Sequence, residues 1–136
     1  MEMKATYIPR SLIQETLASP ESQGKRLLEP LKSLSLQKGV PVHILEDVAV
    51  SNVAEIHAHE ADLWICLSGN VTFVTGGTLV NPSTPNDPRE IKGDAIEGGE
   101  EHVLSEGDVL FIPAGIAHSH YTDGSARLYI IKIPKV

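Results

Sequence analysis

The sequence predicts an all-β domain, either a barrel or a sandwich, preceded by a short and partly helical N-terminal arm. From Val40 onward, short runs rich in β-branched residues alternate with glycine, proline and aspartate, which is typical of strands joined by turns. Helix-like patterns are confined to residues 10–33. The chain has 136 residues, which suggests a single domain that is large enough to bury a core of its own.

The arm is expected to span residues 1–39. Ser11 is placed to cap a short helix that continues through Leu17, and residues 25–34 are expected to hold a second helical turn. Pro20 and Gly24 separate the two segments. Such an arm either covers one end of the barrel or packs on a partner subunit.

The barrel is expected to span residues 40–136. Its predicted strands are residues 40–45, 49–57, 62–68, 70–75, 101–105, 108–113, 116–122 and 126–133. Ser68-Gly69-Asn70 is typical of a tight hairpin turn between two of them. Residues 76–100, rich in glycine and proline, form a long connection, which is either a surface insertion or a functional loop. The short apolar runs at 78–80 and 95–96 indicate that parts of this loop pair or pack.

The composition argues against several classes of partner. The net charge is −7 and the basic residues form no run, which argues against a surface that binds nucleic acid or anionic lipid. No apolar run approaches the length of a membrane span, and the N-terminal residues lack the apolar segment of a signal peptide, so we expect a cytoplasmic location. Cys66 is the only cysteine, so no internal disulfide can form.

Three histidines indicate a site inside the barrel. His57 and His59 are two residues apart, so in a strand their side chains point to the same face. His118 follows a sharp turn at Pro113-Ala114-Gly115, where proline fixes φ and glycine is free to adopt a positive φ. Several imidazole nitrogens that converge on one point are what a transition-metal site needs.

These segments resemble the two signature motifs of the cupin superfamily. The second motif matches through its histidine: Gly107, five residues, Pro113-x-Gly115, two residues, His118, with Thr122 where the family often has asparagine. The first motif is represented by His57-x-His59, by Asp62 in place of the family's glutamate, and by Gly69 at its end. Two features depart from it: only two residues separate His59 from Asp62, and Ser51 stands where the motif begins with glycine.

The resemblance covers roughly residues 40–133 and implies a double-stranded β-helix, a jelly-roll-like barrel with one divalent metal inside. The implied ligands are His57, His59 and His118, with Asp62 either a fourth ligand or an acceptor that orients a histidine. Iron, manganese, nickel, zinc and copper are the metals to expect, because imidazole suits them better than it suits magnesium or calcium.

Other residues near the motifs are candidates for catalysis or substrate binding. Glu60 competes with Asp62 as the carboxylate ligand if a bulge turns it inward, and it is also placed to move a proton. His120 shares the face of His118, as a ligand, a proton-transfer group or a barrel-lining residue. The candidates for lining the substrate cavity are Trp64, Cys66, Phe111 and Thr122, although core packing is the favoured role for Cys66 and Phe111.

Two kinds of function fit the sequence. The first is a metal-dependent enzyme acting on a small organic molecule, with a dioxygenase ranked ahead of an isomerase or lyase. The second is a non-catalytic cupin that binds or senses a metal or a small molecule. We also expect a homodimer, because exposed sheet edges must be covered.

Overall fold

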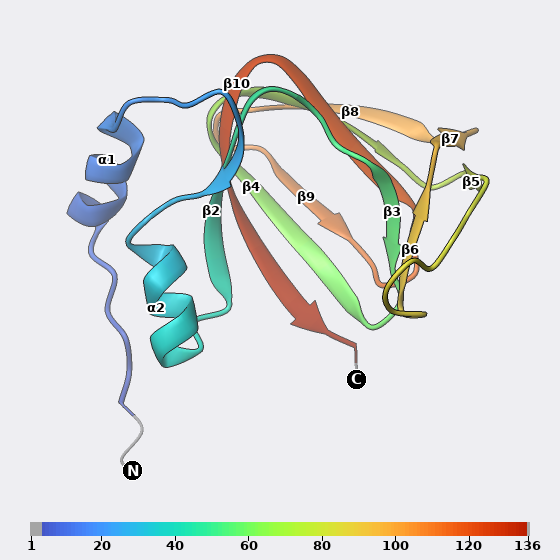
Figure 1. Cartoon of the computed structure of the whole chain (residues 1–136). Helices are drawn as coiled ribbons and strands as arrows, with labels where there is room; N and C mark the ends of the chain where they lie inside the picture. Colours follow the sequence, from blue (N-terminus) through green and yellow to red (C-terminus); the bar gives the residue numbers. More distant parts are fainter. Residues whose placement is uncertain (1–3, 136) are drawn as a thin grey trace.

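A computed structural model describes residues 4–135 as an antiparallel β domain with two short helices at its N-terminal side (Figure 1). None of the helices in this described part has the length and apolarity needed to cross a membrane. The elements are α1 (Arg10–Ala18), β1 (Gly24–Leu27), α2 (Leu31–Lys38), β2 (Val42–Ser51), β3 (Ala54–His57), β4 (Glu60–Thr75), β5 (Thr78–Val80), β6 (Glu90–Gly93), β7 (Ala95–Glu97), β8 (Glu100–Ser105), β9 (Val109–Ile112) and β10 (His118–Pro134).

The strands form one large sheet and one small one. In the large sheet β1, β2, β10, β3 and β6 follow one another, while β4 pairs with β10, β8 and β9. The small sheet contains β5 and β7. The large sheet folds over a buried core that includes Leu45, Trp64, Phe73 and Leu128. The all-β cupin-type fold with a short helical arm, as predicted from the sequence, is confirmed.

Two long strands form the spine of the fold, which corrects the predicted hairpin at residues 68–70. β4 continues through Gly69 instead of reversing, and both of its halves pair with β10. Gly69 has φ +73°, and a Cβ atom there would lie 2.0 Å from the carbonyl oxygen of Ser125. Glycine therefore allows the strand to bend where it crosses closely over β10, rather than to turn back.

The N-terminal arm packs against the barrel of its own chain (Figure 1). Helix α1 begins at Arg10 after Pro9 and has no side-chain cap, so the predicted Ser11 cap is wrong. Residues 24–27 form β1 on the edge of β2, where the sequence predicted helix, because tertiary pairing outweighs the weak local helical pattern. The second helix lies further along the chain, at Leu31–Lys38.

A buried ion pair between Arg127 and Glu46 connects the arm with the barrel. Arg127 on β10 donates from Nε to Oε2 of Glu46 at 2.7 Å, and its other nitrogens donate to the carbonyl oxygens of Thr16 and Ser19 at 2.8 Å each. Arg26 of β1 donates to the other oxygen of Glu46 at 2.7 Å. The arm therefore packs over this ion pair, and both Glu46 and Arg127 are buried in the folded chain.

The long connection at residues 76–100 is largely ordered by pairing. Leu79 of β5 lies opposite Ile96 of β7, which confirms that the two short apolar runs pair. Between them, β6 pairs along the whole length of β3. This segment thereby brings Glu90 next to His57, two residues that are far apart in the sequence.

Candidate metal centre

A cavity of about 460 Å³ opens into the barrel beside β3, β4 and β10. Its volume lies within the usual range of pockets for small molecules, roughly 300–1,000 Å³. Leu45 and Ile130 contribute apolar walls, and charged or polar residues make up much of the remaining lining. Its titratable lining includes Glu55, His57, Asp62, His118 and His120.

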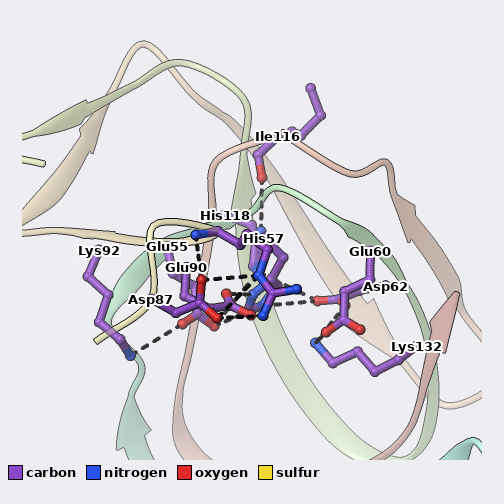
Figure 2. A network of polar contacts seen from close by, with 11 residues as sticks. Glu55, His57, Glu60, Asp62, Asp87, Glu90, Lys92, Ile116, His118 and Lys132 are labelled. Atoms are coloured by element: carbon purple, nitrogen blue, oxygen red, sulfur yellow. Dashed lines mark hydrogen bonds and ion pairs between the residues drawn. The ribbon is translucent and has the colours of Figure 1, made fainter. Parts of the chain in front are cut away.

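Four of these side chains direct one atom each toward a common point (Figure 2). Nε2 of His57 lies 3.4 Å from Oε1 of Glu55 and 3.8 Å from Oδ2 of Asp62. Nε2 of His118 lies 3.8 Å from the same oxygen of Glu55 and 3.6 Å from the same oxygen of Asp62. Imidazole nitrogens and carboxylate oxygens therefore alternate around a ring.

The outer nitrogen of each histidine is bound in a way that frees the inner one. Nδ1 of His118 donates to the carbonyl oxygen of Ile116 at 3.0 Å, and Nδ1 of His57 forms a short hydrogen bond with Glu90 (Figure 2). An acceptor at Nδ1 places the hydrogen there and leaves the lone pair on Nε2. Such partners commonly orient metal-bound histidines.

The two carboxylates are oriented in a comparable way by lysines. Lys132 donates to Oδ1 of Asp62 at 2.7 Å, and this leaves Oδ2 directed inward. Lys92 lies 3.6 Å from Oε2 of Glu55, and this leaves Oε1 directed inward. Each of the four side chains is thus held by its outer atom and presents its inner atom to the centre.

The centre shifts the pKa values of three of these groups. Burial opposes ionisation of Glu55, but its contact with His57 and the neighbouring charges outweigh burial and lower its pKa to about 2. The contact with Glu55 raises the pKa of His57 above its usual value, against the effect of burial. Burial lowers the pKa of His118. Glu55 is therefore ionised and His118 neutral near pH 7, the forms that bind a metal.

The geometry fits a divalent transition metal. Metal–ligand bonds of about 2.1 Å place neighbouring ligand atoms about 3.0–3.4 Å apart, so the four separations of 3.4–3.8 Å given above need to close by a few tenths of an ångström. The ligand atoms of Glu55, His57 and His118 all lie within 4.8 Å of one another, a set that does not include Asp62. In the described part of the chain, Nε2 of His118 and Oδ2 of Asp62 are buried and have no hydrogen-bond partner. Leaving such atoms unsatisfied is costly, and an ion between them removes that cost.

The structure does not bring His59 to this centre. His59 lies in the turn between β3 and β4, and its side chain borders a separate small hollow with Glu60, Asp87, Arg89 and Glu90. The chain turns at Ala58 and His59, so the alternation of a strand that would align His57 with His59 ends before His59. Glu55, two residues before His57 on β3, supplies the ligand atom that the sequence analysis expected from His59.

The first cupin motif is therefore displaced by two residues from its predicted alignment. Read as Glu55-x-His57, four residues, Asp62, six residues, Gly69, the spacing agrees with the family pattern. The position of the leading glycine then falls on Ala49, a non-glycine residue with φ +51°. The short interval between His59 and Asp62 was the sequence signal of this displacement, because a frame that starts at Glu55 restores four residues before Asp62.

The remaining predicted site residues divide between the cavity and other places. Trp64 and His120 line the cavity. Cys66 lies in the core and contacts the carbonyl oxygens of Ser68 and Gly69, and Thr122 is buried where it donates to the carbonyl of Asn70. Phe111 is 54% exposed on the outside of β9, so neither a core nor a cavity role fits it.

Glu60 lies at the start of β4, on the rim of the site. Its Oε1 is 3.8 Å from Nζ of Lys132, and a carboxylate oxygen of Glu60 also lies close to His57 and Glu90. This second group shares His57 with the first, but its carboxylates, Glu60 and Glu90, are only partly buried. Asp62, rather than Glu60, supplies the carboxylate buried beside His118.

Fold and motif geometry together define the chain as a member of the cupin superfamily, as its sequence predicted. More particularly, a family model described as the JmjC domain matches residues 49–133, so the chain belongs to this family. The match includes all four side chains of the candidate centre.

Solved structures share the fold. The X-ray structure of YcfD from E. coli is 22% identical and gives a TM-score of 0.56, covering 70% of this chain and 25% of that chain. Protein NMB1881 from Neisseria meningitidis is 10% identical with a TM-score of 0.50, covering 90% and 95% respectively. The chain thus spans about a quarter of the length of YcfD. No curated protein matches it.

Proposed function

We propose that the chain is a metal-dependent enzyme acting on a small organic molecule, with one divalent transition metal held by Glu55, His57, Asp62 and His118. One observation carries the proposal: buried Nε2 of His118 and Oδ2 of Asp62 face each other at 3.6 Å without partners among the described residues. Two groups that both accept hydrogen bonds at these atoms gain nothing from each other, but both bind a cation.

The donor set narrows the choice of metal. Two imidazoles and two carboxylates favour iron, manganese or zinc, whereas copper(I) prefers softer ligands. Among these, iron fits the reaction ranked first, a dioxygenase, because histidines and a carboxylate with open positions are the ligands of non-haem iron oxygenases. When bound, the metal supplies Lewis acidity or oxygen activation.

The chain's own residues prepare the site for that chemistry. Glu90 and the carbonyl of Ile116 fix the histidine tautomers, and the lysines at positions 92 and 132 orient the carboxylates. A transition metal held by these four side chains would keep open positions for substrate or oxygen. The cavity of about 460 Å³ beside them is large enough for a small organic substrate and places it next to the metal.

The experiment that tests the proposal is elemental analysis of protein purified without a metal-affinity tag and reconstituted with Fe²⁺, Mn²⁺ or Zn²⁺. Near-stoichiometric metal is expected in the native protein and in His59→Ala, the matched control. It should be lost in Glu55→Ala and His118→Ala. If His59→Ala loses its metal while Glu55→Ala retains it, the motif alignment centred on His57-x-His59 would be correct and the proposed ligand set would be wrong.

Turnover separates the enzyme from a non-catalytic binding protein. Protein that holds its metal but converts none of a panel of small acids, phenols and sugars, with or without oxygen, would favour the binding or sensing function. The cytoplasmic location and the homodimer expected from the sequence stay predictions. Cell fractionation tests the first, and a sedimentation experiment showing only the 14.7 kDa species would contradict the second.

A further inference from the structure

Three more buried polar atoms of cavity-lining residues have no hydrogen-bond partner among residues 4–135: Nδ1 of the half-buried His43 and, on two deeply buried side chains, Nε1 of Trp64 and Nδ1 of His120. Both side chains line the cavity, with 5% and 2% of their residue surface exposed. Their ring centroids are 5.4 Å apart. A buried donor or acceptor without a partner is destabilising, so these two atoms favour a polar occupant of the cavity.

The neighbours of His120 determine what its free nitrogen can do. Nε2 of His120 lies 2.8 Å from Oδ2 of Asp47, a carboxylate that is itself fully buried. The carboxylate accepts the hydrogen from Nε2, so Nδ1 carries the lone pair and acts as an acceptor. The indole Nε1 of Trp64 is only a donor. Trp64 and His120 therefore offer one donor and one acceptor in the cavity wall.

We propose that Trp64 and His120 form a subsite for a hydroxyl group of the substrate, with Asp47 as the positioning residue. A hydroxyl accepts from Trp64 and donates to His120 with one oxygen atom. An ether can accept but not donate, and a hydrocarbon can do neither. The assignment rests on the proposed function in that it describes the substrate of the same cavity, but neither residue is among the candidate metal ligands.

The position of the subsite restricts the substrate further. His118 and His120 are two residues apart on β10, so the subsite lies roughly 7 Å along the strand from the metal centre. Leu45 and Ile130 give the cavity apolar walls. The substrate class is therefore a small hydroxylated organic molecule with a compact carbon frame, whose metal-binding group, such as a carboxylate, lies about one ring width from the hydroxyl.

Three probes of nearly equal shape test the subsite by calorimetry on the zinc-loaded protein, which cannot perform redox turnover. They are trans-4-hydroxycyclohexanecarboxylate, its 4-methoxy ether and cyclohexanecarboxylate. The hydroxy acid is expected to bind about 10-fold or more tightly than the other two, since it alone satisfies both atoms. Trp64→Phe keeps the ring but removes the donor, and His120→Phe removes the acceptor, so each should erase most of this preference.

Phe73→Leu is the matched control. Phe73 packs against the rings of both Trp64 and His120 but has no polar atom, so this variant disturbs the packing and should keep the preference. Equal affinities of the three probes for the native protein, or no binding of any of them, would overturn the subsite and indicate that water alone satisfies these atoms. Equal preference in Trp64→Phe and in the native protein would overturn it as well.

A metal-free arm separates this inference from the proposed function. Trp64 is the only tryptophan, so its fluorescence reports directly on cyclohexanol and methoxycyclohexane, which carry no metal-binding acid. Stronger quenching by cyclohexanol in protein that fails to bind any metal would keep the subsite while refuting the metal centre. The same quenching by both probes, in protein that does bind metal, would refute the subsite alone.

Discussion

Replacing Arg127 with methionine should remove about 3 kcal/mol from the free energy of unfolding. The substitution keeps an apolar side chain of similar length but takes away the donors to Glu46 and to the carbonyl oxygens of Thr16 and Ser19. Breaking a buried ion pair by removing one partner costs about 3–5 kcal/mol. The lower end applies because Arg26 and the amide of Ser22 still bind the other oxygen of Glu46.

Urea unfolding followed by circular dichroism measures this loss. With a slope of about 2 kcal/mol per molar, the urea midpoint should fall by about 1.5 M, and the melting temperature by roughly 12 °C. Arg26→Met is the matched control, because the Arg26 side chain is 42% exposed and an exposed pair contributes at most about 1 kcal/mol. A loss below about 1 kcal/mol in Arg127→Met, or equal losses in both variants, would refute the argument that burial makes this pair important.

Three further predictions follow from the same structure. The difference in unfolding free energy between the native protein and Arg127→Met should become smaller in acid. Burial opposes ionisation of Glu46, but Arg26 and Arg127 lower its folded pKa below the usual 4.5, so the stability that the ionised Glu46 contributes is fully present above pH 4.5 and is lost as pH falls through the folded pKa. A constant difference in urea titrations from pH 7 to pH 3 would contradict this. Gly69→Ala should destabilise the fold by about 2–4 kcal/mol, because the new Cβ would meet the Ser125 carbonyl and the residue has a positive φ. Gly124→Ala is the control and should change the melting temperature little, because nothing lies within 4 Å of a Cβ there. Similar melting temperatures for both variants would be evidence against the close approach of Gly69 to β10. Glu90→Gln should weaken metal binding about 10-fold or more in a competition titration with a chelating dye, because it replaces the charged acceptor at Nδ1 of His57. Glu97→Gln on β7 is the control and should bind metal as the native protein does. An unchanged affinity in Glu90→Gln would mean that Glu90 does not orient the histidine.

The barrel was predictable from the sequence because its second motif is local. Gly107, Pro113, Gly115 and His118 act through backbone turns within twelve residues, and the structure has positive φ at both glycines. The first motif was harder to align. The pair His57-x-His59 attracts attention, but the sequence does not show that the strand ends at His57, so the turn residue His59 was assigned in place of Glu55.

Long-range pairing explains the other differences. A glycine between two apolar runs is typical of a hairpin, and only the pairing of both runs with β10 shows that β4 continues through Gly69. In the same way, Glu90, Lys132 and Asp47 reach the cavity residues from segments that no local pattern connects with them. Their roles depend on sheet register, which a single sequence does not specify strongly enough to be deduced.

Two of the candidate ligands lie on the short strand β3, which is less extensively paired than the strands β4 and β10 that carry the other two. Glu55 and His57 lie on these four residues, which pair with β6 throughout but with the β10 spine only where Glu55 faces His118. The unit of β3 and β6 can therefore open locally without unfolding β4 and β10. A metal ion held by the proposed ligands would connect β3 with β4 through Asp62 and with β10 through His118, so we expect occupancy to favour the closed conformation. Amide hydrogens of Ala54–His57 should accordingly exchange with solvent more slowly once the metal is bound.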